Sequence, residues 1–122
     1  MRHPLEEARR CHAAKAFSAC AVMCGKAIEA ICVEKVQAKT LQEGLRKLKD
    51  AGIIDAKLYD WAEALRKERN LGAHATGEAV AKEDARDLLE FVVAICDYVY
   101  VLAEKYAEYL QRKSRSQAQS KK

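Results

Sequence analysis

The chain has 122 residues, which is enough for one domain with a modest hydrophobic core. Of these residues 50% are apolar and 33% are charged, and one proline with five glycines favours long helices over strands. No run approaches the ~20 apolar residues of a membrane span, and no signal-peptide pattern opens the chain, so we expect a globular cytoplasmic protein.

The first predicted helix runs from Leu5 to about Val36, because apolar residues recur there at steps of three and four. Pro4 suits the first turn of this helix, because the backbone N–H that proline lacks would have no hydrogen-bond partner within the helix there. The middle of the segment has mostly small side chains, several alanines and Gly25 among them. Another helix can therefore approach closely there.

Capping patterns mark the next two helices. Thr40 and Glu43 have the spacing of a capping box, which predicts a helix from Leu41 to about Asp50, with Gly52 after its end. Asp55 suits the N-cap of a third helix, which should extend from 56 to 70 or 71.

A long final helix is predicted from about Lys82 to Arg112, and its apolar residues form a heptad seam. Further apolar residues lie outside that seam, so one face should be covered by a second copy of the chain. Tyrosines near the end suit such an interface, although they could also cap the core. The predicted fold is all-α: a dimeric four-helix up-and-down bundle with long first and last helices. The seam residues are Leu88, Val92, Ile95, Val99, Leu102, Tyr106 and Tyr109.

The positive charge lies mainly at the C-terminal end. The net charge is +4, but residues 111–122 contain five basic residues and no acid, which leaves −1 for the remainder. We predict a helical domain over residues 1–112 and a basic, disordered tail over residues 113–122, because that tail has too little apolar surface to order itself. Such a tail could contact phosphates or serve only solubility.

Five cysteines occur without CxxC spacing, each inside an apolar helical pattern, and we interpret them as reduced core residues. Cys20 and Cys24, one helical turn apart, could bind a metal ion with His12, but no fourth ligand is evident. Core packing is the preferred reading. We expect neither a metal ion nor another cofactor.

The segment from Arg66 to Ala75 concentrates chemistry at a predicted helix end. If Gly72 adopts the left-handed conformation, the chain turns back and His74 can lie beside Arg69 and Asn70. The negative end of the helix dipole would favour a protonated imidazole there. Such a histidine can act as general acid or base in phosphodiester cleavage, while an arginine holds the phosphate. The alternative is an ordinary basic helix cap.

Arg69-Asn70-Leu71-Gly72-Ala73-His74 resembles the signature of the HEPN superfamily: arginine, a polar residue, three variable residues and histidine. The slim first helix with Gly25-Lys26-Ala27-Ile28-Glu29, the segment 41–54 and the acidic start of the last helix are similar to one bacterial branch of these all-helical domains. The resemblance covers roughly residues 6–102.

The resemblance implies a metal-independent endoribonuclease of a phage-defence or toxin system, acting through a composite site between two subunits. Carried over, His74 is the acid or base, Arg69 the phosphate clamp and Asn70 its polar support. Arg66 and Lys26 are further candidate substrate-binding residues, and Glu29 could orient either arginine. In that branch an arginine often stands at the position of Arg66 and a glycine at that of Arg69, so which arginine contacts phosphate stays open.

With RNA as substrate, its 2′-hydroxyl can be the nucleophile, and the products are a 2′,3′-cyclic phosphate and a 5′-hydroxyl. The expected partners are a second copy, through the last helix and the Asn70–His74 turn, RNA, and an antitoxin or defence protein. The alternative is a non-catalytic HEPN dimerisation module that binds RNA, a nucleotide or a partner protein.

Overall fold

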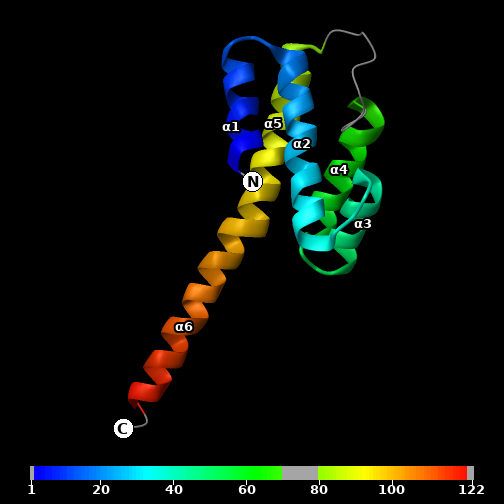
Figure 1. Cartoon of the computed structure of the whole chain (residues 1–122). Helices are drawn as coiled ribbons and strands as arrows, with labels where there is room; N and C mark the ends of the chain where they lie inside the picture. Colours follow the sequence, from blue (N-terminus) through cyan, green and yellow to red (C-terminus); the bar gives the residue numbers. More distant parts are fainter. Residues whose placement is uncertain (1, 70–79, 121–122) are drawn as a thin grey trace.

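The computed structural model describes residues 2–69 and 80–120, and all regular secondary structure in these ranges is helical (Figure 1). The predicted all-α class is confirmed. The helices, with η1 denoting a π-helix, are α1 (Arg2–Ala13), α2 (Phe17–Val36), α3 (Leu41–Asp50), α4 (Ala56–Arg69), α5 (Lys82–Cys96), η1 (Asp97–Leu102) and α6 (Ala103–Ser120).

The predicted single helix from Leu5 to Val36 is wrong, because the chain reverses at residues 14–16 and forms α1 and α2 side by side (Figure 1). Lys15 has a φ of 63°, in the left-handed region. The Lys15 N–H donates to the His12 carbonyl at 3.0 Å, and the Ala16 N–H donates to the Cys11 carbonyl at 2.8 Å. This is the Schellman pattern that ends many helices, here formed without glycine.

Both predicted caps are confirmed. The Thr40 hydroxyl accepts a hydrogen bond from the Glu43 N–H at 3.2 Å, and α3 ends before Gly52, whose φ is 74°. The Asp55 carboxylate accepts from the Leu58 N–H at 2.8 Å and starts α4. Each bond satisfies a backbone donor that the helix itself leaves without a partner.

The core lies around α2, which packs against α1, α3 and α5, while α4 packs against α3 and α5. The Trp61 and Phe91 rings meet edge to face, with centroids 5.1 Å apart, and join α4 to α5. The largest fully buried side chains come from α2, α3 and α5, together with Ile54 just before the Asp55 cap. They are Phe91, Ile28, Ile31, Leu45, Leu48, Ile54, Ile95, Val92, Cys20, Cys24 and Cys32.

The last helix begins at Lys82 as predicted, passes through η1 and continues in α6 to Ser120, beyond the predicted end at Arg112. Residues 113–120 are thus helical, in contrast to the disordered tail that we predicted. Within the described residues, α6 contacts η1 alone and projects from the body (Figure 1). The end of α4 and the start of α5 lie at the opposite end of the body (Figure 1).

Candidate functional site

Arg69, the first residue of the predicted signature, lies on α4, which is described from Ala56 to Arg69. Asn70 and His74 lie outside the described residues, as does Gly72, and the Arg69 side chain is likewise not described. The catalytic roles of Arg69, Asn70 and His74 therefore stay predictions. What the structure adds is the position of Arg69 on α4, from which this signature continues.

Arg66, the other candidate phosphate ligand, is already paired. Its Nε donates to Glu63 Oε1 at 3.3 Å and its terminal nitrogen donates to Glu63 Oε2 at 2.9 Å. The two side chains are only 29% and 20% exposed, so water screens this bidentate pair less than a surface pair. The Glu63 carboxylate raises the pKa of the Arg66 guanidinium.

This pairing differs from the partner that we considered for Arg66, because Glu29 is exposed on α2. Lys26 is exposed on the same helix. Among the described residues, no Cα atom of α2 comes within 8 Å of one in α4. The structure therefore does not bring Lys26 or Glu29 together with Arg66.

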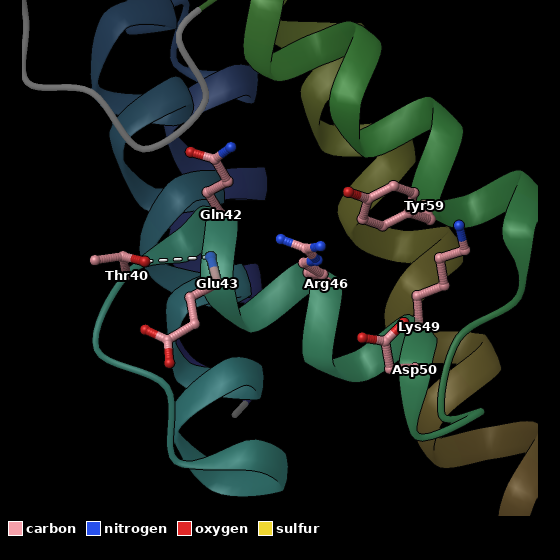
Figure 2. Close-up of a pocket in the computed structure, with 7 residues that line it drawn as sticks. All are labelled: Thr40, Gln42, Glu43, Arg46, Lys49, Asp50 and Tyr59. Carbon is pink, nitrogen blue, oxygen red and sulfur yellow. Dashed lines mark hydrogen bonds between the residues drawn. The ribbon is translucent and has the colours of Figure 1, made fainter.

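Sequence reasoning missed a polar pocket between α3 and the start of α4 (Figure 2). Its volume is about 590 Å³. Arg46 and Lys49 point into it from one face of α3, and Tyr59 closes it from α4 (Figure 2). The lining residues are Thr40, Gln42, Glu43, Arg46, Lys49, Asp50 and Tyr59.

Nothing in the sequence distinguished this pocket, since Arg46 and Lys49 have the spacing of any solvated helix face. Only the packing of α3 against α4 brings Tyr59 to them. The Lys49 ammonium lies 4.6 Å from the centroid of the Tyr59 ring, a cation–π distance.

The cysteines are free thiols, and Cys20, Cys24 and Cys32 are buried as predicted. Burial, with the neighbouring Cys20, strongly raises the pKa of the Cys24 thiol, so this side chain stays protonated near neutral pH. His12 lies at the end of α1, and its ring meets Phe17 of α2 edge to face with centroids 5.4 Å apart. In the ranges that the structure describes, no group of three or more His, Cys, Asp or Glu side chains is arranged to hold a metal ion.

A second polar cluster joins η1 to α2. The Tyr100 hydroxyl donates to the Glu34 carboxylate at 2.9 Å, and the Lys35 ammonium lies 4.9 Å from the Tyr100 ring centroid. Burial and the adjacent carboxylate raise the pKa of Tyr100. The cluster fixes η1 against α2, because a neutral phenol keeps its donor across the physiological range.

None of the helices in the described ranges is both long enough and apolar enough to cross a membrane. Neither a curated protein nor a solved structure matches the chain. One family model, described as "Domain of unknown function (DUF4145)", matches residues 6–113. Because this match spans most of the 122 residues, the chain belongs to that family.

Proposed function

We propose that the chain is a metal-independent endoribonuclease of the HEPN type, with Arg69, Asn70 and His74 as its catalytic residues. The observation that supports the proposal is that α4 extends to Arg69, the first residue of the signature, as the predicted helix end at residue 70 or 71 requires. His74 follows five residues later. The negative pole of the helix favours an imidazolium near that end, which is the form that a general acid requires.

Arg69 is the better candidate for the phosphate clamp. Arg66 would have to give up both contacts with the partly buried Glu63 carboxylate before it could hold phosphate in the same bidentate way. Arg66 would then act by shaping the end of α4, and Arg69 would contact the substrate. Lys26, exposed on α2, is retained only as a more distant contributor to RNA binding.

We also propose that two copies associate through the last helix. The predicted heptad pattern continues through Leu102 at the end of η1 to Tyr106 and Tyr109 on α6, and these side chains are 51%, 60% and 46% exposed. An apolar helical face of this kind calls for a partner. The proposed interface also includes the Asn70–His74 turn, as the resemblance implies.

A non-catalytic dimerisation module that binds RNA, a nucleotide or a partner protein is the second candidate. The same exposed face of α6 favours it, because that face requires association and does not require chemistry. A role in phage defence or as a toxin, with an antitoxin or defence partner, rests on the resemblance of the signature alone.

The decisive experiment is cleavage of a mixed single-stranded RNA pool by the purified protein in EDTA, with the product ends identified. Cutting should leave 2′,3′-cyclic phosphate and 5′-hydroxyl ends. It should fall by at least about 100-fold in His74→Ala and in Arg69→Ala, the scale on which general acid–base groups and charge-stabilising groups act.

Arg86→Ala is the matched control, because Arg86 is an exposed arginine that pairs with Glu90 on α5. Arg66→Ala should reduce cutting less than Arg69→Ala. Light scattering on the same preparations reports the dimer. A folded dimer that does not cut RNA would favour the non-catalytic binding module. A monomer that cuts RNA would exclude a catalytic site shared between two subunits.

A further inference from the structure

We propose that the pocket between α3 and α4 binds a nucleoside monophosphate unit, either free or as one residue of a single-stranded RNA, with its phosphate on Arg46 and Lys49. The pocket contains none of the proposed catalytic residues. Its occupancy and the proposed cleavage can therefore fail separately.

The charge of the pocket favours an anion. Among the described residues, Arg46 forms no ion pair, so its five N–H donors are available to a ligand. Glu43 also lines the pocket, but its carboxylate pairs with Lys47 at 2.9 Å and points away from the Arg46 guanidinium (Figure 2). Asp50 offsets one of the two pocket cations, which leaves one positive charge.

The Lys49 ammonium is held in the pocket by its contact with Tyr59. It lies over the Tyr59 ring at 4.6 Å from the centroid, a contact that positions the charge without neutralising it. Figure 2 shows the Arg46 guanidinium between Gln42 and Tyr59, with the phenol oxygen directed toward it. A phosphate placed beside Arg46 can accept hydrogen bonds from its planar fork, and the Lys49 ammonium adds a second positive charge to the pocket.

The other lining groups suit the nucleoside. The Lys49 ammonium covers one face of the Tyr59 ring, and the other face is a flat aromatic surface for a base. The Gln42 amide can both donate to and accept from a base edge. The Thr40 hydroxyl accepts from the Glu43 N–H, so its own hydrogen can still be donated to a ligand. A volume of about 590 Å³ lies within the usual range of small-molecule sites and admits a mononucleotide.

The position of the pocket also agrees with a strand of RNA that passes the proposed catalytic end. Tyr59 and Arg69 are ten residues apart on α4, which is about 15 Å along the helix axis. A strand bound at both places would span a few nucleotides.

The test uses the full chain at one fixed ionic strength in EDTA. AMP and adenosine are titrated by calorimetry, and a fluorescein-labelled, 2′-O-methylated RNA hexanucleotide is titrated by anisotropy, since that RNA lacks the nucleophile for cleavage. We expect AMP to bind at least about tenfold more tightly than adenosine, the factor of one charge-assisted hydrogen bond.

Arg46→Gln should weaken AMP binding about tenfold or more, and Tyr59→Leu should weaken both AMP and adenosine. Arg86→Gln, which changes an exposed arginine outside the pocket, should leave affinity within about twofold. Binding of the hexanucleotide but not AMP, with the same loss in Arg46→Gln, would identify RNA as the source of the phosphate. No binding of either ligand, or equal losses in Arg46→Gln and Arg86→Gln, would overturn the proposal.

Discussion

The α5 and α6 helices are joined through η1, and the same predicted heptad pattern covers both, yet their surroundings are opposite. In α5 the seam residues Leu88, Val92 and Ile95 are at most 3% exposed, because α1, α2 and α4 pack around them. In α6 the seam reaches Tyr106 and Tyr109, which are 60% and 46% exposed. A periodic pattern thus reports that a helix needs a partner and does not say whether the partner is in the same chain.

The difference also separates two kinds of stability. Helices α1 to α5 are held by a shared core, whereas α6 has 18 residues that contact only η1 within the described ranges. An isolated helix of that length is marginal in water. Substitutions in the body should therefore change the free energy of unfolding, and substitutions in α6 should change association.

The largest effect is expected from Phe91→Ala. Phe91 is fully buried and meets Trp61 edge to face, so truncation should lower the free energy of unfolding by about 3–5 kcal/mol. Tyr106→Ala, on the exposed seam, should change it by less than about 0.5 kcal/mol at concentrations where the chain is monomeric. Urea titration followed by circular dichroism measures both changes. Equal losses would contradict the division into a body, helices α1 to α5, and a projecting α6.

Gly44→Ala should be the next most damaging change. A Cβ at Gly44 would stand 2.5 Å from both Cβ and Sγ of Cys32, so α3 would have to move away from α2. Overpacking of this kind costs about 1–3 kcal/mol. Gln42→Ala, two residues earlier and exposed, is the matched control and should stay within about 0.5 kcal/mol. A neutral Gly44→Ala would mean that the two helices are less closely packed than described.

Lys15→Gly should stabilise the body. Lys15 holds a φ of 63°, a conformation that costs a residue with a Cβ about 1–2 kcal/mol and glycine almost nothing. The gain should be about 1 kcal/mol or less, since glycine also gains entropy in the unfolded chain. Thermal melting compares it with Ala13→Gly, at the last residue of α1, which should destabilise because glycine is a poor helix former. A loss of stability in Lys15→Gly would show that the turn at 14–16 has another conformation.

The pH dependence above neutrality should come partly from the buried thiols. Burial, with the Glu29 carboxylate, raises the pKa of Cys32 to about 11, above the 9.0 of an exposed thiol. Between these values the folded state keeps a proton that the unfolded state releases, so stability should fall as the pH rises from about 9 to 11. Denaturation at a series of pH values measures the slope, which should be smaller in Cys32→Ala. An unchanged slope would contradict the burial of this thiol.

The smallest effect on the body is expected from Tyr106→Glu combined with Tyr109→Glu. Both side chains are exposed on α6, so the melting temperature of the monomer should hardly change. Association should weaken by more than about tenfold, because a charge on the seam must be desolvated in any helix pair. Light scattering over a concentration series tests this against Glu104→Gln, a change to a polar residue on the same helix. Unaltered association would place the interface elsewhere.

Several elements were predictable because their signals are local. Thr40 and Asp55 mark helix starts through a side-chain oxygen that caps the next turn, and Gly52 marks an end through its left-handed backbone. The described part of α4 reaches Arg69, and the predicted helix end at residue 70 or 71 stays a prediction because it lies outside the described residues. The candidate signature was likewise visible only as a sequence, and its proposed chemistry awaits the cleavage experiment.

The missed features arise from packing over long distances in the chain. Residues 13–16, Ala-Ala-Lys-Ala, are good helix formers, so nothing local predicts the reversal at Lys15. The pocket was invisible because Arg46 and Tyr59 come from different helices. The pairing of Arg66 with Glu63 could have been found, since a spacing of three residues on a helix favours an ion pair.

The sequence by itself determined the all-helical class, the caps of α3 and α4, the burial of Cys20, Cys24 and Cys32, and membership of the DUF4145 family. These depend on composition, periodicity and contacts within a few residues. Only the tertiary structure decided that the first segment folds back on itself, that the predicted heptad pattern is buried in α5 but exposed in α6, and that α3 and α4 line a common pocket. Each of those outcomes depends on which helix surfaces pack together. The hydrophobic effect that drives this packing is non-directional, so an apolar pattern in the sequence does not specify its partner.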